Sequence, residues 1–287
     1  MLPDCDVVQG VPTLHNSVVF PIPQGEDTLR HLRTGYGMTD WDNLVQLFRK
    51  SERWIAFTGA GISAESGIPT YRGSGEESLW SKYDPDKYAR IDSFLDDPTY
   101  YWSFFRDERY PQLTSAPPNM AHHTLAHWES LGKLTCVITQ NIDGLHRMAG
   151  SKDVIELHGN AQRIYCMDCQ AQYTADEAYQ RLQVVMPPDC ERCGGRIRPD
   201  VVFFGEMLPE GALERAYKEA GDCDLMLSIG SSLVVYPAAD IPYQAQRSGA
   251  ALVIINRDPT PLDVIANAVI HDPAGEVLPK LSEALGI

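Results

Sequence analysis

Apolar runs of strand length recur along the chain, separated by stretches in which apolar residues return at helical spacing. The runs predict buried strands at residues 54–57, 134–139, 153–157, 224–229 and 250–255. The helical stretches lie at residues 40–50, 98–110, 119–131, 209–220, 238–248 and 274–285. Strands that alternate with helices are typical of an α/β fold with a doubly wound parallel sheet.

Three segments depart from this alternation. Residues 72–97 are polar and irregular, and a connection of this length predicts a functional loop or a small inserted subdomain. Residues 201–206 are apolar and predict an extended segment. Residues 1–37 show no long period and are expected to wrap around the domain or to fray.

A glycine turn follows the first apolar run, at Gly59-Ala60-Gly61. Glycine lets backbone N–H groups approach a diphosphate closely, so a strand, this turn and a short helix form a dinucleotide-binding fingerprint. An ordinary tight turn between strand and helix is the alternative. A dehydrogenase would also place an acid after the second strand to hold the ribose. The acids at that distance, Glu76 and Glu77, fall in the irregular segment, which argues against hydride transfer.

Short stretches rich in polar residues or glycine follow the other predicted strands. They are Gln140, Asn141, Ile142 and Asp143 after one run, His158 after the next, then Gly230, Ser231 and Ser232, and finally Asn256, Arg257 and Asp258. The carboxyl ends of parallel strands share one edge of the sheet, so these residues are expected to converge on one site. A neutral histidine such as His158 is a candidate general base. His122, His123 and His146 are expected to be helix or core residues.

Four of the seven cysteines form two pairs, Cys166-x-x-Cys169 and Cys190-x-x-Cys193. Residues 170–189 separate the pairs, which is a zinc-ribbon spacing. Four thiolates predict a closed, structural zinc site. A redox dithiol and two disulfides are the alternatives. Cys136 and Cys223 lie in apolar surroundings that predict core packing.

Composition narrows the functional classes. With 39 acidic and 24 basic residues the net charge is −15, which argues against direct nucleic-acid binding. The charge would suit a Lys-rich protein partner, or it serves solubility alone. The chain has neither a membrane-length apolar run nor a signal-peptide pattern at Met1, so we expect no membrane span and a cytoplasmic location.

Together these motifs resemble the sirtuins, which are NAD-dependent protein lysine deacylases. The similarity covers residues 41 to 287, and residues 1–40 form an N-terminal extension outside it. It implies a large Rossmann-like part at residues 41–71, 121–160 and 201–287. A small part would combine a helical insertion at residues 72–120 with a zinc ribbon at residues 161–200.

The resemblance also implies roles for single residues. Asn141, Asp143 and His158 would be catalytic. NAD would contact Gly59, Ala60, Gly61, Ser63, Tyr71, Arg72, Gln140, Asn141, Ile142, Asp143, Gly230, Ser231, Ser232, Asn256, Arg257 and Asp258. An acyl-lysine protein or peptide would contact Val202, Phe203, Phe204, Gly205, Glu206, Leu233, Val234 and Val235. One structural zinc would be held by Cys166, Cys169, Cys190 and Cys193.

The chain departs from the family pattern where the acyl group is expected. Thr70-Tyr71 replaces the usual Asp-Phe pair, and this threonine resembles the branch that removes acidic acyl groups. That branch uses a Tyr-x-x-Arg pair where this chain has Phe105 and Glu108. Glu108 would repel a carboxylate, so a neutral acyl group is expected.

Two other functions remain open. One is a protein ADP-ribosyltransferase, and the other is an NAD-sensing module without turnover. The presence of Asn141, Asp143 and His158 favours deacylation over both. The sequence does not indicate an oligomeric state.

Overall fold

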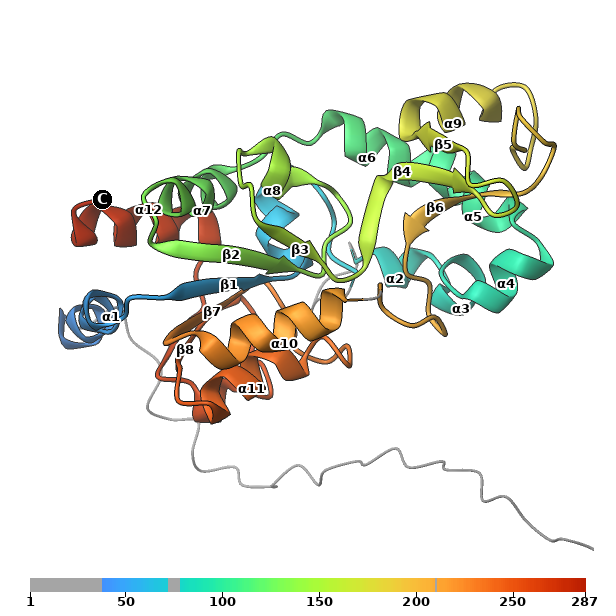
Figure 1. Cartoon of the computed structure of the whole chain (residues 1–287). Helices are drawn as coiled ribbons and strands as arrows, with labels where there is room; N and C mark the ends of the chain where they lie inside the picture. The colour runs from blue at the N-terminus through green and yellow to red at the C-terminus, as the bar shows by residue number, and fades with distance from the viewer. Residues whose placement is uncertain (1–37, 72–77, 210) are drawn as a thin grey trace, which may run out of the picture.

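A six-stranded parallel sheet forms the centre of the larger part of the molecule (Figure 1). The structure is a computed structural model that describes residues 38–71, 78–209 and 211–287. The strands are β1 (Trp54–Thr58), β2 (Leu134–Thr139), β3 (Val154–Glu156), β7 (Leu225–Ile229), β8 (Ala251–Ile255) and β9 (Ala268–Ile270). They lie in the order β3-β2-β1-β7-β8-β9, and every neighbouring pair is parallel. The order reverses between β1 and β7, where ligands bind in such sheets.

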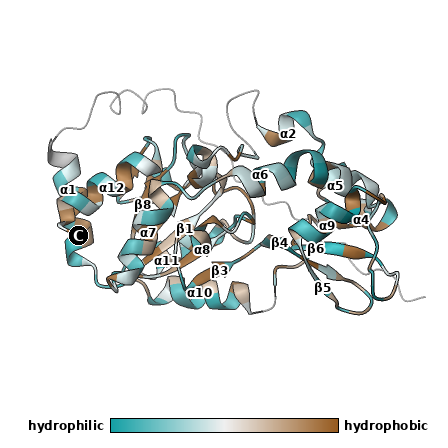
Figure 2. Ribbon diagram, turned by 90° about the horizontal axis from the view of Figure 1, so that it is seen from above, coloured by the Kyte–Doolittle hydropathy of each residue, from teal (hydrophilic) through white to brown (hydrophobic). Residues whose placement is uncertain are grey.

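Helices cover both faces of this sheet. One face packs against α1 (Met38–Lys50), α7 (Met120–Ser130) and α12 (Ala274–Leu285). The other packs against α10 (Ala212–Asp222) and α11 (Asp240–Arg247). The α10 ribbon carries both hydrophilic and hydrophobic residues (Figure 2). Alternate residues of β1 enter the two cores, which explains why its whole run is apolar. The described part of the chain has no helix that could cross a membrane.

A second, three-stranded sheet lies beside the carboxyl ends of the large sheet (Figure 1). It contains β4 (Gly159–Cys166), β5 (Gln172–Thr174) and β6 (Ile197–Val201), all antiparallel, together with α9 (Ala175–Leu182). The chain before it forms α2 (Leu79–Lys82), α3 (Pro85–Tyr88), α4 (Ile91–Asp96), α5 (Thr99–Phe104), the π-helix η2 (Phe105–Arg109) and α6 (Tyr110–Ser115). The two share a core in which Trp102 and Phe105 lie with Ile164 and Ile197.

The structure adds detail to several local expectations and changes others. Within residues 78–97, most of the segment expected to be a loop or an inserted subdomain is helical. Asp84 caps α3 through the Asp86 backbone N–H at 3.0 Å, and Pro85 suits the first turn. The extended segment at residues 201–206 is mostly not a strand, since β6 ends at Val201. The sequence does not indicate the strand β6, because Pro199 argues against a strand at this position. Proline is tolerated there because β6 is an edge strand.

Other elements had no counterpart in the sequence prediction. They are β4, β5, α9, β9, the short helix α8 (Leu145–Met148) and the 3₁₀ turn η3 (Asp263–Ile265). The expected helix at residues 98–110 contains the π-turn η2 and continues to Ser115. Residues 1–37 and Arg72, with the expectations placed on them, lie outside the described residues.

Candidate active site

A cavity of about 910 Å³ lies between the carboxyl ends of the large sheet and the second unit. Most of the residues that the sequence indicates as cofactor or substrate contacts line it: Gly59, Ala60, Gly61, Tyr71, Gln140, Asn141, Ile142, His158, Val202, Phe203, Phe204, Gly205, Glu206, Gly230, Ser231, Ser232, Val235, Asn256, Arg257 and Asp258. The cavity therefore joins the expected cofactor and substrate residues in one space.

Two glycine turns meet at the point where the strand order reverses. The Gly59 N–H donates to the Ile229 carbonyl at 3.0 Å, and the Gly61 N–H donates to the Gly230 carbonyl at 2.8 Å. A Cβ on Gly61 would lie 2.7 Å from the Gly230 Cα, and Gly230 has φ +63°. Only glycines permit this contact between backbones, which leaves an open cradle above the 3₁₀ turn η1 (Ala60–Ser66).

Asn141 is held by a buried set of hydrogen bonds beneath the cavity. Its Nδ2 donates to the Gly59 carbonyl and to Ser63 Oγ, both at 3.1 Å. Ser63 Oγ donates to Asp143 Oδ2 at 2.7 Å, and Asp143 Oδ1 accepts from the Leu145 N–H at 2.9 Å. Burial raises the pKa of Asp143, against the effect of these hydrogen bonds. Ser63 and Asp143 do not line the cavity; they orient Asn141, which does.

The His158 ring is fixed in one tautomer. Its Nδ1 lies 2.9 Å from the Gln140 carbonyl oxygen, which can only accept, so Nδ1 carries the proton. Burial lowers the pKa of His158 below 6.5, and the ring is neutral near pH 7. The lone pair on Nε2 is then available to a group in the cavity. Gln140 is itself held, since its Nε2 donates to Ser231 Oγ at 2.8 Å.

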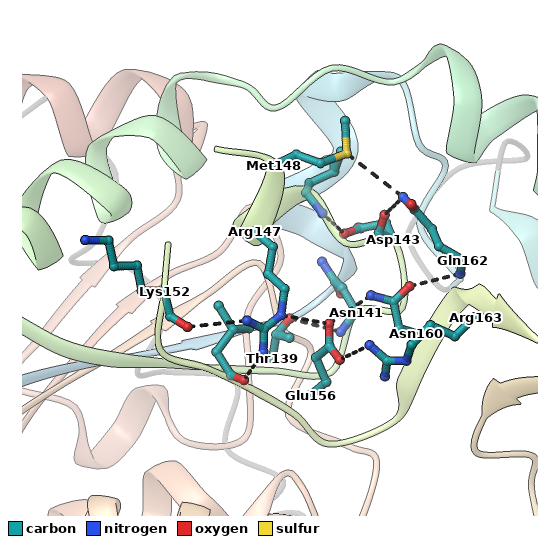
Figure 3. Close-up of polar contacts among 12 residues, drawn as sticks. Thr139, Asn141, Asp143, Arg147, Met148, Lys152, Glu156, Asn160, Gln162 and Arg163 are labelled. Carbon is teal, nitrogen blue, oxygen red and sulfur yellow. Dashed lines mark hydrogen bonds and ion pairs between the residues drawn. The ribbon is translucent and has the colours of Figure 1, made fainter. Parts of the chain in front are cut away.

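Behind these residues, charged and amide side chains connect the two units (Figure 3). Gln162 Nε2 donates to the Asp143 carbonyl at 3.1 Å, and Asn160 Nδ2 donates to Glu156 Oε1 at 2.8 Å. Glu156 also pairs with Arg163 at 2.9 Å. These contacts tie β3 and β4 together on either side of His158.

The segment after β6 is fixed at several points. The Val202 N–H donates to the His158 carbonyl at 3.0 Å. The Glu206 carboxylate accepts two hydrogen bonds from buried Arg198, at 2.6 and 2.7 Å, and one from the Phe203 N–H at 2.9 Å. Burial alone would raise the pKa of Glu206, but the Arg198 guanidinium and the Phe203 N–H lower it. Glu206 is therefore an ionised anchor for this segment.

Two residues expected at the substrate are not in the cavity lining. Leu233 is 2% exposed and belongs to the core, and Val234 is 49% exposed and outside the cavity lining. Their neighbour Val235 does line the cavity. The Asn256 side chain donates to the Asp258 carbonyl at 2.7 Å, which holds that turn in place.

The sequence interpretation missed several residues of the cavity wall. They are Trp80, Tyr88, Tyr101, Phe104 and Arg109, and the aromatic run that holds most of them indicated only core packing. The two residues used to judge the acyl group do not line the cavity. Phe105 is fully buried in the core. Glu108 accepts a hydrogen bond from the Tyr83 hydroxyl at 2.7 Å. Glu108 is therefore outside the cavity lining, and the neutral acyl group that it was used to predict stays a prediction.

The four paired cysteines converge at the far end of the second unit. Their Sγ atoms all lie within 4.8 Å of one another, and the Cys166–Cys193 and Cys169–Cys190 pairs are 3.6 Å apart. These separations exclude disulfides and fit a tetrahedral zinc site, in which sulfur atoms lie about 3.8 Å apart.

The histidines and cysteines expected in the core are found there. Cys136 and Cys223 are buried, and burial raises the pKa of each thiol to about 12. His122 and His146 are also buried, whereas His123 lies exposed on α7.

Comparison with known proteins gives consistent matches. The Sir2 family matches residues 59–237. The "NAD-dependent protein deacylase 2" of Archaeoglobus fulgidus is 46% identical over 240 residues, which cover 83% of this chain and 93% of that protein. A structure titled "Sir2-p53 peptide-NAD+" has a TM-score of 0.77 at 41% identity and covers 85% of this chain and 97% of its own. Another, "Sir2 bound to acetylated peptide", has a TM-score of 0.79 at 40% identity, with 86% and 98% covered.

Proposed function

The chain belongs to the Sir2 family and is an NAD-dependent protein deacylase, and we propose that its cavity binds NAD and an acyl-lysine side chain together. One observation carries the proposal. The neutral His158 ring, with Nε2 free, lines the same cavity as the glycine cradle and residues 202–206. A base, an anion-binding turn and an apolar wall thus share one space.

NAD is consumed as a substrate and supplies the ADP-ribose that accepts the acyl group. The cradle at Gly59, Gly61 and Gly230 would leave room for the diphosphate, because a Cβ at these positions would meet backbone atoms. The N–H groups of these three glycines themselves donate to protein carbonyls. The turn at residues 256–258 would contact the adenosine end. Tyr71 would lie at the nicotinamide ribose, and residues 140–143 would form the nicotinamide pocket, with Ser63 and Asp143 acting through Asn141.

Residues 202–206 would form the acyl-lysine side of the site. Val202 and Phe204 would wall the acyl chain, because an apolar wall accepts a neutral amide, whereas a free ammonium would lose its hydration. Gly205 and Glu206 on one side, and residues 233–235 on the other, would pair with the peptide backbone in an extended conformation. Holding the weakly nucleophilic acyl oxygen against the ribose would be most of the catalysis.

His158 would act as the general base. Its Nε2 would take a proton from a ribose hydroxyl, while the Gln140 carbonyl holds the Nδ1 proton and the ring orientation. A lowered pKa keeps this nitrogen unprotonated at physiological pH.

We also propose a structural zinc ion in the four-cysteine site, since its four thiols leave no open position for catalysis. The sheet that carries this site and the helices from α2 to α6 would form the small domain, and the rest the large domain, with boundaries as predicted. We propose a cytoplasmic location as well, because four cysteines that hold zinc must stay reduced.

The test is mass spectrometry of an acetyl-lysine peptide incubated with the protein, with and without NAD. We expect NAD-dependent loss of the acetyl group with formation of nicotinamide and O-acetyl-ADP-ribose. H158A should lose this activity, whereas the matched control H123A, at an exposed histidine, should keep it.

Each alternative function has its own result. Nicotinamide release without deacetylation, with ADP-ribose added to a protein, would indicate the transferase. No turnover of NAD with any acyl peptide would indicate a binding module and contradict the proposal.

A further inference from the structure

His158 lies where the chain passes from one sheet to the other. Glu156 is the last residue of β3 in the large sheet, and Asn160 belongs to β4 in the second sheet. Only Leu157 and His158 lie between the end of β3 and the start of β4. The direction of the His158 side chain therefore depends on how the two sheets meet.

A hydrogen bond between two side chains spans this connection (Figure 3). Asn160 Nδ2 donates to Glu156 Oε1 at 2.8 Å. Glu156 Oε2 lies 2.9 Å from Arg163 Nη1 of β4, and Arg147 Nε of α8 lies 3.6 Å from Glu156 Oε1. The Glu156 side chain is only 11% exposed. One mostly buried carboxylate thus holds β4 at two points, and an arginine of α8 holds the same carboxylate from the side of the large sheet.

The donors and acceptors of this hydrogen bond are fixed in one arrangement. Asn160 is 6% exposed, and its Oδ1 accepts from the Gln162 N–H at 2.9 Å, so its Nδ2 is the group that faces Glu156. Glu156 must then offer one acceptor to Asn160 and another to Arg163. A carboxylate does this with its two oxygens, whereas one of the two terminal atoms of a glutamine is a donor. E156Q therefore removes the charge and one acceptor with little change in the size of the side chain.

His158 is itself held from both sheets. Its Nδ1 donates to the carbonyl of Gln140, which follows β2, at 2.9 Å. Its backbone carbonyl accepts from the N–H of Val202, which follows β6, at 3.0 Å. A change in the angle between the sheets would lengthen one of these two contacts and turn the ring. The bond between Glu156 and Asn160 opposes such a change, because it joins the two sheets directly on either side of His158.

Neither Glu156 nor Asn160 lines the cavity, whereas His158 does. We propose that Glu156 and Asn160 are positioning residues for His158, and that their hydrogen bond keeps its Nε2 directed at the ribose hydroxyl. The inference rests on the proposed deacylase function and adds two residues outside the cavity to it. A shift of about 1 Å in a reacting group can lower a rate about 100-fold, so a support outside the cavity has a measurable effect.

The test compares E156Q, N160D and the double variant E156Q/N160D with the unmodified protein in the acetyl-lysine peptide assay. Each single variant should lower kcat by about 10- to 100-fold and change the KM for NAD by less than about threefold, because neither residue lines the cavity. N160D keeps an acceptor for the Gln162 N–H but places a second carboxylate against Glu156.

The double variant restores the hydrogen bond in the opposite direction, because the glutamine amide then donates to the aspartate. Its loss in kcat should be at least about tenfold smaller than the two single losses multiplied together. The matched control is D153N, which breaks the ion pair between Asp153 and Arg215 at the other end of β3 and should keep the kcat of the unmodified protein.

A second measurement separates positioning from general damage to the site. In the proposed reaction the acyl oxygen first displaces nicotinamide from C1′ of the ribose. Only then does the ribose hydroxyl, which gives its proton to His158, attack the acyl carbon. In a single turnover, E156Q and N160D should slow O-acetyl-ADP-ribose formation about 10- to 100-fold and nicotinamide release less than about threefold. Melting curves give the folded fraction of each variant, and the rates are expressed per folded molecule.

Three outcomes would overturn the inference. They are an unchanged kcat in both single variants, single losses that multiply in the double variant, and nicotinamide release slowed as much as O-acetyl-ADP-ribose formation. The third would mean that the hydrogen bond only supports the fold around the cavity. If E156Q does not fold, N160D, which keeps the arginine partners of Glu156, decides through the rates of the same two steps. Absence of NAD-dependent deacetylation by the unmodified protein would instead contradict the proposed function itself.

Discussion

Acidification should destabilise this protein through two buried histidines, His122 and His146. They are 0% and 2% exposed, and their ring centroids are 4.9 Å apart. His122 Nε2 and His146 Nδ1 have no hydrogen-bond partner among the described residues, so a proton on either would meet no acceptor there. Burial lowers the pKa of His122 to about 4 and that of His146 well below its ordinary value.

The magnitude follows from the difference between folded and unfolded states. An unfolded histidine has a pKa near 6.5, so between pH 6.5 and about 4 the unfolded chain binds more protons than the folded one at His122. The free energy of unfolding therefore falls as the pH drops through this window. At pH 5 the loss from His122 alone is about 2 kcal/mol. A typical domain has only about 5–15 kcal/mol in total, so the effect is large.

Urea unfolding between pH 5 and 8, with zinc supplied, measures this dependence. H122Q removes one titrating group, and the slope of unfolding free energy against pH should decrease by up to about 1.4 kcal/mol per pH unit. H127Q, at an exposed histidine on the same helix α7, should keep the slope of the unmodified protein. Comparing slopes separates the titration from any general destabilisation by the substitution. Equal slopes for H122Q and the unmodified protein would refute the reasoning.

Three further predictions concern the site and its supports. G61A places a Cβ 2.7 Å from the Gly230 backbone, so the two glycine turns must move apart, and NAD binding measured by calorimetry should weaken at least about tenfold. The control G221A, at a glycine with free space around it, should bind NAD normally. E206Q leaves Arg198 without its charged partner and should lower the free energy of unfolding in urea by about 2–3 kcal/mol, a smaller loss than breaking a fully buried ion pair causes. An unchanged free energy of unfolding would show that the ion pair does not stabilise the protein. Chelation should remove about one zinc per chain, measured by elemental analysis, and should lower the melting temperature of the protein. An unchanged melting curve after loss of the metal would contradict a structural role for the four-cysteine site.

Much of the large sheet could be predicted because its strands are buried on both faces. Residues 54–57 are a continuous apolar run, and residues 225–229 are interrupted only by Ser228, since alternate residues enter the two cores on either side of the sheet. Parallel strands then place their following residues at one edge. For this reason Gly59, Gln140 and Gly230, which are far apart in the sequence, could be expected around one cavity.

Elements that are stabilised by contacts with residues distant in the sequence could not be predicted. The strand β6 holds Arg198 and Pro199, which a sequence interpretation does not assign to a strand. Arg198 is stable there because Glu206 folds back to it, and Pro199 because β6 pairs on one side only. Both reasons depend on the tertiary structure, which the local sequence does not show. By contrast, the capping box between Thr174 and Glu177 is a local signal that could have revealed α9.

The place of Glu108 depends on a backbone hydrogen bond that the sequence does not show. The sequence argument put residue 108 at the acyl group by matching Trp102-Ser103-Phe104 to the family pattern. In the structure the Tyr110 N–H binds the Phe105 carbonyl, which inserts one residue into the turn. Glu108 then binds the Tyr83 hydroxyl, and Arg109 lines the cavity. A match of sequence positions cannot place a side chain where the helix gains a residue.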